Sequence, residues 1–258
     1  MALIIPSDSD SSLGVTIRNG GANFSVYSRN ARAIELLFFD HEDDAKPSRI
    51  IPIDHRSQRT YHYWHTFVEG VETGQLYAYR VHGPFDPNNG HRFDPDRILL
   101  DPYGRSVAVP RNYNREAASE TGDNASVAMK SVVVDPLAYD WQGDRPLRRP
   151  SSQTIIYEMH VRGFTRHPSS GVDEDKRGTY AGLIDKIPYL QQLGITAVEL
   201  LPVFQFDIYD APPGRVNYWG YSPISFFAPH HAYSSRKDHL GAADEFRDMV
   251  KALHAAGI

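Results

Sequence analysis

The side chains best suited to chemistry gather in the last third of the chain, in an aromatic run at residues 217–221 that reads NYWGY. Tyr218, Trp219 and Tyr221 carry rings with a polar edge, and such rings suit flat ligands edged with hydroxyl groups, such as sugars. The same rings are ordinary core residues, and composition alone favours the core. The run is therefore a candidate binding surface whose meaning depends on the elements around it.

Other titratable side chains in this region are weaker candidates. His230 and His231 are adjacent on a loop, so their rings point in different directions, and no third ligand is placed beside them. Packing is therefore favoured over a metal pair. His160 lies on a predicted strand, where a hydrogen-bonded core histidine is expected more often than a catalyst. Glu158 and Glu199 lie on neighbouring predicted strands and could form a carboxylate pair. No metal site and no cofactor is predicted.

The aromatic run follows a strand–helix–strand unit. Residues 154–161 (TIIYEMHV) and 197–202 (AVELLP) read as near-continuous apolar strands, which predicts a parallel pair buried on both faces. In such folds chemistry takes place at the carboxyl ends of the strands, on the loops that follow them. The run at 217–221 comes after the second strand, where a binding site is expected.

A broken helix is predicted between the two strands, within residues 179–194. Gly194 provides a C-terminal stop. Pro188 lies inside the helical pattern, which predicts a kink or two short helices that meet near Lys186. The apolar positions that follow helical spacing are Leu183, Ile187, Leu190 and Leu193.

A second amphipathic helix is predicted over residues 242–255, and Ile258 would open a third strand where the sequence ends. A closed barrel of eight strand–helix units takes about 250 residues. Residues 150–258 supply two strands and two helices, and two parallel strands do not close a core. We therefore expect the chain to be the first part of a longer protein, or a partial record of one.

The chain before residue 150 has a different character and predicts a separate domain. Short alternating strands with turn signals between residues 13 and 82 indicate a β-sandwich. Residues 70–74 form a loop of hairpin length, residues 111–126 read as a mobile excursion, and residues 144–150 read as a linker. The predicted strands are 22–27, 34–39, 61–68, 75–82 and a last one near 132–134.

Composition excludes several classes of protein. The net charge of −5 comes from interspersed acidic and basic residues, so there is no basic stripe for nucleic acid. No apolar run approaches the 18 or more residues of a membrane span, and the N-terminus lacks the basic start of a signal peptide. The chain has no cysteine, which excludes disulfides and thiolate chemistry and fits a cytoplasmic location.

Several stretches resemble one family. Residues 156–165 (IYEMHVRGFT) and 193–203 (LGITAVELLPV) look like the first and second barrel strands of the α-amylase superfamily of glycoside hydrolases. The aromatic run, with residues 227–229 (FAP), resembles the loop after the second strand. Three upstream stretches are close to the glycogen-debranching and isoamylase branch. They are residues 77–84 (YAYRVHGP), 90–95 (GHRFDP) and 99–103 (LLDPY).

The resemblance implies a multidomain fold, β and then α/β. Residues 1–149 would be an Ig-like β-sandwich of the carbohydrate-binding-module kind with a loop extension. Residues 150–258 would be the start of a (β/α)8 TIM barrel, truncated before its third strand. The implied reaction is hydrolysis of α-1,6 branch points of glycogen, amylopectin or limit dextrin with retention, by a pair of carboxyl groups.

The family carries those carboxyl groups on the fourth and fifth barrel strands, with a further aspartate after the seventh. None of these strands is present, so no catalytic residue is assigned and the chain alone is expected to be inactive. Tyr221 matches the family tyrosine that stacks under the sugar next to the scissile bond, and Tyr218 and Trp219 would extend this platform. Glu158 and Glu199 are then expected to be structural. Trp64 is expected to pack rather than to bind glucan.

Two other interpretations stay open. One is a non-catalytic glucan-binding or scaffold fragment. The other is a different reaction on the same scaffold, either that of a branching enzyme or that of a maltooligosyltrehalose trehalohydrolase.

Overall fold

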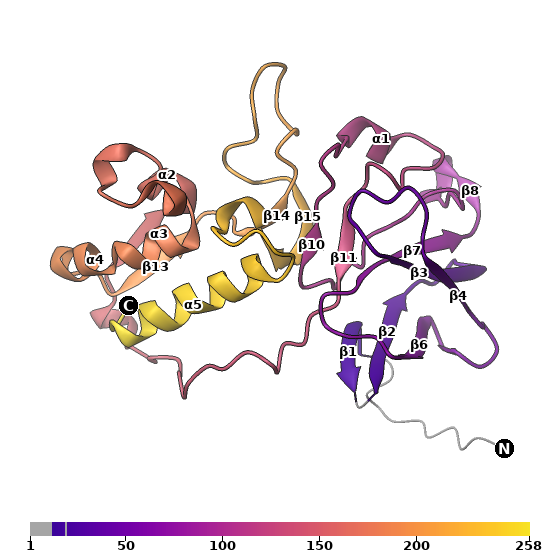
Figure 1. The fold of residues 1–258 in the computed structure, drawn as a ribbon, viewed down its shortest axis with the longest axis horizontal. Coiled ribbons are helices and arrows are strands. Elements are labelled where there is room, and N and C mark those ends of the chain that lie inside the picture. Colours follow the sequence, from indigo (N-terminus) through magenta and orange to yellow (C-terminus); the bar gives the residue numbers. More distant parts are fainter. Residues whose placement is uncertain (1–11, 19) are drawn as a thin grey trace. The chain divides into compact units, whose positions relative to one another are not determined.

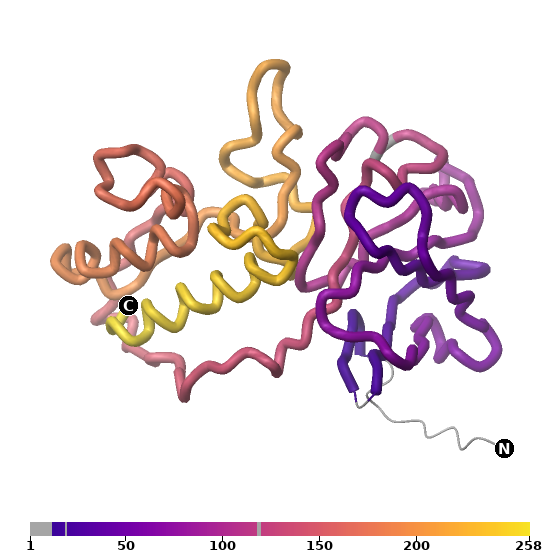
Figure 2. Tube along the Cα trace, viewed as in Figure 1, coloured from indigo at the N-terminus to yellow at the C-terminus, as the bar shows by residue number. Residues whose placement is uncertain are grey.

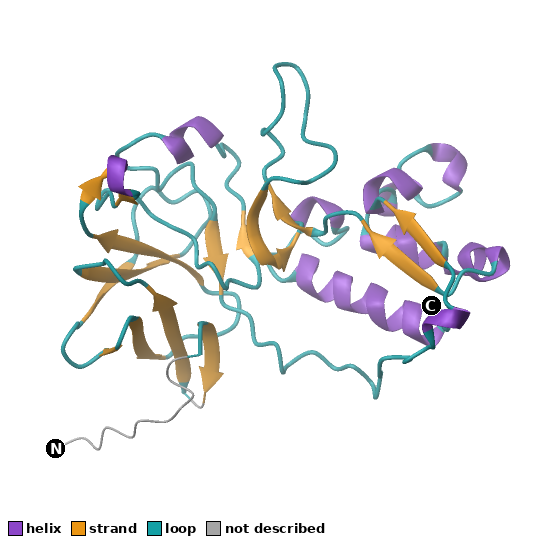
Figure 3. Ribbon diagram, turned by 180° about the vertical axis from the view of Figure 1, so that it is seen from behind, coloured by secondary structure: helices purple, strands orange, loops and turns teal. Residues whose placement is uncertain are grey.

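The computed structural model describes residues 12–18 and 20–258, and the chain divides into two compact units, Met1–Asp135 and Pro136–Ile258. Figures 1 and 2 follow the chain through both units. Figure 3 shows that strands dominate the first unit, whereas helices are frequent in the second. None of the helices in the described part of the chain is long and apolar enough to cross a membrane.

The first unit is an antiparallel β-sandwich, as predicted. Its sheets have the strand orders β1-β2-β6-β5 and β10-β11-β7-β3-β4. Successive side chains of a strand point to opposite faces, so each sheet turns one apolar face toward the other. The first sheet contains β1 (Gly14–Arg18), β2 (Gly21–Tyr27), β5 (Arg59–Thr60) and β6 (Tyr63–Glu69). The second contains β3 (Ala33–Phe39), β4 (Arg49–Ile53), β7 (Leu76–His82), β10 (Val107–Ala108) and β11 (Lys130–Val132).

Aromatic side chains from both sheets fill the core of the sandwich. Phe24 of β2 meets Tyr77 of β7 edge to face, with ring centroids 5.1 Å apart. Trp64 of β6 is fully buried, and its indole N–H donates to the carbonyl of Ser28 over 3.1 Å. The expectation that Trp64 packs rather than binds glucan is therefore confirmed.

Two details of the first unit differ from the prediction, and one small hairpin was not predicted. The loop at 70–74 is not a hairpin, because β6 and β7 lie in different sheets and the loop crosses between them. The stretch after β7 forms a small hairpin of β8 (Phe85–Asp86), η1 (Pro87–Asn89) and β9 (His91–Arg92). The segment 111–126 contains helix α1 (Arg115–Ser119), and the buried Asn124 anchors it by accepting from the Ile98 N–H over 2.8 Å.

Two buried charged side chains hold loops against the sandwich. Lys130 donates to the carbonyl of Glu42 over 2.6 Å, and burial lowers the pKa of this lysine. Asp101 accepts from the Tyr77 hydroxyl and from the Tyr103 N–H, each over 2.8 Å. Burial raises the pKa of Asp101 to about 6, because it removes water from the carboxylate. Both loops are therefore positioned by contacts distant in the sequence.

The second unit begins with the predicted strand–helix–strand order. β12 (Ile156–Met159) and β13 (Ala197–Leu200) pair in parallel, with α2 (Val161–Thr165), α3 (Tyr180–Asp185) and α4 (Ile187–Leu193) between them. Next come the antiparallel pair β14 (Phe204–Phe206) and β15 (Pro223–Pro229) and the helix α5 (Gly241–Ala255). Short 3-10 turns are η2 (Ser151–Gln153), η3 (Pro168–Ser170), η4 (Glu174–Lys176) and η5 (His231–Tyr233).

The predicted break in the connecting helix is confirmed. Lys186 ends α3 and begins α4, and Pro188 lies in the first turn of α4. A proline is tolerated there because the first N–H groups of a helix have no partner within the helix. Gly194 ends α4 with a φ of 81°, a left-handed conformation that glycine adopts at little cost. The predicted stop at Gly194 is therefore also confirmed.

The first parallel strand is shorter and more exposed than predicted. Strand β12 ends at Met159, because His160 caps helix α2 instead of continuing the strand. The pair is not buried on both faces. Ile156 is 60% exposed, and Glu158 and Glu199 lie opposite each other on the same exposed face. No element of the described chain covers this face. Ile258, predicted to open a third strand, is buried but lies outside the described strands.

The segment at 136–150 runs along α5 within the second unit. The Tyr139 hydroxyl donates to Asp248 over 2.6 Å, and His254 pairs with Asp144 over 2.7 Å. The sequence predicted a domain boundary after residue 149, whereas the compact units meet after Asp135. The difference arises because the polar side chains of this segment, which in the sequence suggest a linker, bind the polar side of helix α5. The assignment of domains to residues 1–149 and 150–258 stays a prediction.

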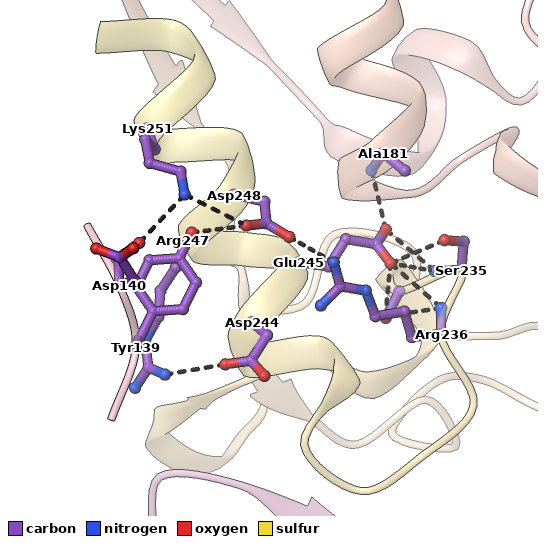
Figure 4. Close-up of polar contacts among 11 residues, drawn as sticks. Tyr139, Asp140, Ala181, Ser235, Arg236, Asp244, Glu245, Arg247, Asp248 and Lys251 are labelled. Atoms are coloured by element: carbon purple, nitrogen blue, oxygen red, sulfur yellow. Dashed lines mark hydrogen bonds and ion pairs between the residues drawn. The ribbon is translucent and has the colours of Figure 1, made fainter. Parts of the chain in front are cut away.

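A buried carboxylate holds the helices of the second unit together. Glu245 of α5 accepts from the Ala181 N–H at the start of α3 over 2.9 Å, and from the Ser235 N–H and hydroxyl over 2.9 and 2.8 Å (Figure 4). Burial by itself raises the pKa of Glu245. The hydrogen bonds from Ser235, Ala181 and Ser234 outweigh burial, so the pKa lies below the ordinary value of 4.5. This carboxylate is therefore ionised, and both of its oxygens accept hydrogen bonds.

We predict that Glu245→Gln lowers the free energy of unfolding of the second unit by about 1–3 kcal/mol, because an amide nitrogen would face several N–H and O–H donors. Because the folded-state pKa is lowered, the Glu245 contribution is present above pH 4.5 and is lost as the pH falls through the folded-state pKa. Hydrogen exchange at the amides of α5, measured from pH 7 down to pH 4, tests both statements.

Asp244→Asn is the matched control, because Asp244 is a neighbouring residue whose ion pair with Arg247 is partly exposed. Its effect should stay within about 0.5 kcal/mol. Equal protection of α5 in the Gln variant and in the unmodified chain would contradict the proposed role of Glu245.

Candidate functional site

The aromatic run lies on a long loop between β14 and β15, which extends beyond the strands in Figure 1. The base of the loop is closed by a hydrogen bond of 2.9 Å from the Asp207 N–H to the Ser222 carbonyl. Asn217 bridges the loop, since its backbone N–H donates to Ile208 over 2.8 Å and its side-chain amide donates to Asp207 over 3.1 Å. The loop is therefore held by its own backbone.

His160 connects this loop to the end of β12. Its Nδ1 accepts from the Gly163 N–H over 3.1 Å, so the ring proton lies on Nε2. Nε2 then donates to the backbone carbonyl of Tyr218 over 2.7 Å, and the Tyr233 hydroxyl lies 3.2 Å from the same nitrogen. The expectation of a buried, hydrogen-bonded His160 is confirmed. This residue positions the aromatic loop.

Two rings of the predicted platform gather around His160. The Tyr218 ring stacks on the imidazole with centroids 4.1 Å apart and an angle of 8°. Trp219 meets Tyr218 edge to face at 5.2 Å and keeps 57% of its surface exposed. Gly163 allows this arrangement, because a Cβ there would collide with the Tyr218 hydroxyl oxygen.

Tyr221 stands apart from this cluster. It is 70% exposed, and no ring contact of Tyr221 is found among the residues that the structure describes. Gly220 separates it from Trp219 with a φ of 85°, and a Cβ at Gly220 would lie 2.9 Å from the Phe206 ring. The structure therefore brings Tyr218 and Trp219 together and leaves Tyr221 on its own, with its ring available to solvent.

Tyr218 lines two cavities. One, of about 670 Å³, is open and includes Glu158, His160, Leu201 and Trp219 in its lining. The other, of about 420 Å³, is lined mainly by apolar and aromatic side chains, together with Arg162 and Asn217. The apolar and aromatic residues are Phe206, Ile208, Val216, Tyr218, His230, Ala232 and Tyr233. The first cavity faces the carboxyl end of β12, which is where chemistry is expected in this type of fold.

The two adjacent histidines pack into the unit. His230 stacks on Phe206 with centroids 3.9 Å apart, and burial lowers its pKa to about 3. Burial likewise lowers the pKa of His231 to about 4, and the His231 Nδ1 lies 3.1 Å from the side-chain amide oxygen Oε1 of Gln205. Both rings are therefore neutral at pH 7. Within the described ranges, no group of three or more histidine, aspartate or glutamate side chains is placed to hold a metal.

Two family models match the chain. Residues 12–104 match carbohydrate-binding module 48, described as the isoamylase N-terminal domain, and residues 159–258 match the catalytic domain of alpha amylase. The fold and these matches define the class of the chain, a carbohydrate-binding module followed by the start of an amylase-type (β/α)8 domain.

Curated relatives narrow this class. The chain is 42% identical to the glycogen operon protein GlgX homolog of Mycobacterium tuberculosis, over 95% of this chain and 35% of the relative. It is 43% identical to the glycogen debranching enzyme of Yersinia enterocolitica, over 98% of this chain and 38% of the relative. It is 40% identical to chloroplastic isoamylase 1 of rice (Oryza sativa subsp. japonica), over 95% and 31%. The chain thus spans about a third of the length of these relatives.

Solved structures agree on the fold. The product complex of SpuA, a glycogen-degrading pneumococcal virulence factor, superposes with a TM-score of 0.76 at 24% identity, over 96% of this chain and 26% of that one. The pullulanase from Bacillus acidopullulyticus gives 0.72 at 24% identity, over 96% and 28%. The resemblance to the glycogen-debranching and isoamylase branch of the α-amylase superfamily is therefore confirmed over nearly the whole chain.

The local sequence does not show how the site is built. It does not connect His160 or Gly163 with the aromatic loop, because 54 residues lie between Gly163 and Tyr218. The available signal was the glycine directly after Arg162, in a segment that then continues as a helix. A glycine inside a helix is destabilising, which suggests that another group approaches the backbone closely.

We predict that Gly163→Ala displaces Tyr218 and destabilises the second unit by about 1–3 kcal/mol, the usual effect of overpacking. The same change in a Tyr218→Phe background should be neutral or slightly stabilising, because the colliding oxygen is gone and alanine favours helix. Unfolding curves of the four proteins, read as a double-mutant cycle, measure the coupling. Equal destabilisation in both backgrounds would show that the collision is not with Tyr218.

Proposed function

We propose that this chain forms the first part of a glycoside hydrolase that hydrolyses α-1,6 branch points of glycogen or starch with retention. The identity of 40–43% over 95–98% of the chain to proteins named as debranching enzymes and isoamylase carries this proposal. The aromatic loop at the carboxyl end of β12 supports it, because sugars bind to aromatic rings through their C–H faces. The proposed partner is a branched α-glucan.

The chemistry assigns a limited role to the described residues. Retaining hydrolysis needs a nucleophilic carboxylate and a carboxylic acid about 5 Å apart, and the resemblance places both on later barrel strands. Glu158 and Glu199 are not proposed for these roles. Tyr221 would support the sugar next to the scissile bond, with Trp219 and Tyr218 extending the platform around His160. The chain therefore supplies one wall of the site.

A cytoplasmic location is part of the same proposal. A chain without cysteine forms no disulfide and needs no oxidising compartment, and its relatives include a protein named glycogen debranching enzyme. Fractionation of cells, with antibody detection of the protein, is the direct test.

Product analysis tests the reaction. The protein carrying the complete barrel should release linear maltooligosaccharides from glycogen or amylopectin, whereas the pure chain of residues 1–258 should release none. New branch points in the product would instead indicate a branching enzyme, and release of trehalose from an added maltooligosyltrehalose would indicate a trehalohydrolase. Debranching by the pure chain would contradict the assignment of the catalytic carboxyl groups to later strands.

We predict that Tyr221→Ala in the complete enzyme lowers kcat/KM by about fivefold or more, which corresponds to at least about 1 kcal/mol of transition-state binding from one aromatic contact. Because Tyr221 is highly exposed, its removal should leave the thermal midpoint nearly unchanged. Tyr221→Phe keeps the ring and is the matched control. An unchanged kcat/KM in the Ala variant would remove Tyr221 from the site.

A further inference from the structure

A second group of exposed rings lies on the first unit, at the tip of the β5–β6 hairpin. We call Tyr27, Tyr61, His62 and Tyr63 the tip cluster. Tyr61 is 76% exposed and Tyr27 is 48% exposed. The rings form a continuous series, with centroids 3.8 Å apart for Tyr61 and His62, 5.8 Å for His62 and Tyr27, and 5.4 Å for Tyr27 and Tyr63.

The backbone of Tyr61 is strained. Thr60 pairs with Tyr63, so Tyr61 and His62 form a two-residue hairpin loop, and Tyr61 has a φ of 59°. This position in a hairpin favours glycine, asparagine or aspartate, because a bulky side chain at positive φ is strained. Such strain costs on the order of 1–3 kcal/mol and is found mainly at functional sites. A large exposed ring therefore stands where a small residue would be more stable.

The neighbouring residues hold the tip cluster rigidly. Arg59 donates to the Tyr61 carbonyl over 2.9 Å, and its guanidinium lies 4.8 Å from the centre of the Trp64 ring in the core. The Ser28 N–H donates to the His62 carbonyl over 2.9 Å, which ties the loop to the end of β2. A rigid ring surface loses little conformational entropy when a ligand binds. The arrangement is therefore prepared before any ligand arrives.

We propose that the tip cluster is a binding surface for a linear α-glucan chain, separate from the aromatic loop of the second unit. The exposed tyrosine rings offer apolar faces for the C–H face of a glucose unit and hydroxyl groups at their edges for its hydroxyls. No hydrogen bond to the Tyr27 or Tyr61 hydroxyl is found among the described residues, so both are available. A neutral, hydroxyl-rich ligand suits this surface. The choice of α-glucan rests on the proposed function.

The test is titration of the 258-residue chain with maltoheptaose by calorimetry, in a Tyr221→Ala background that removes the most exposed ring of the candidate site in the second unit. Tyr61→Asn should weaken binding at least about fivefold, as expected for the loss of one aromatic contact. Asparagine tolerates positive φ, so the same variant should keep or raise the thermal midpoint of the first unit. Loss of binding without loss of stability separates a binding role from a structural one.

Two further variants complete the design. Tyr27→Ser should weaken maltoheptaose binding in the same way. Phe85→Ser should leave it unchanged, because Phe85 is also an exposed ring, at 62%, but lies on the β8–β9 hairpin of the same unit. The proposal is overturned if maltoheptaose does not bind in the Tyr221→Ala background, if Tyr61→Asn binds normally, or if only Phe85→Ser loses affinity. Because the titration measures binding without catalysis, a failure of the proposed debranching reaction can be distinguished from a failure of maltoheptaose to bind the tip cluster.

Discussion

The buried carboxylate of Glu245 is the constraint on which the second unit depends. A charge in the interior is tolerated only if hydrogen bonds replace the lost water, and here the backbone and hydroxyl groups of residues 234–236 and the first turn of α3 supply them. Because the donors come from two segments and the carboxylate from a third, the three segments cannot move independently. Helix α5, the start of α3 and the turn after η5 are therefore fixed relative to one another, beneath the parallel strands.

The candidate site uses the same principle with a neutral group. His160 ends a strand, caps a helix and holds the aromatic loop, because an imidazole can accept at one nitrogen and donate at the other. The stacked Tyr218 covers the ring and completes its burial. The rings nearest His160 use one face for packing and cannot offer that face to a ligand, whereas Tyr221 is more exposed and offers more ring surface.

The first unit shows how a strand separates core rings from surface rings. Trp64 and Tyr63 are adjacent on β6, but the alternation of side chains buries one in the sandwich and leaves the other on the outer surface. Composition cannot distinguish the two, and neither can a count of aromatic residues. The tip cluster emerges only when the register of β2 against β6 brings Tyr27 beside Tyr63 and the hairpin places Tyr61 and His62 next to them.

The sequence by itself determined the sandwich, the parallel pair, the two-part helix that breaks at Lys186 and the family resemblance, because these follow from local periodicity, turn residues and long motifs. It also located the aromatic loop. It did not determine that β6 and β7 lie in different sheets, that residues 136–149 bind α5, or that Gly163 makes room for Tyr218. Those features depend on which surfaces meet after the chain folds. Only the tertiary structure decides such contacts. The local sequence pattern of a segment is compatible with several neighbours, and residues distant in the sequence determine which neighbour it packs against.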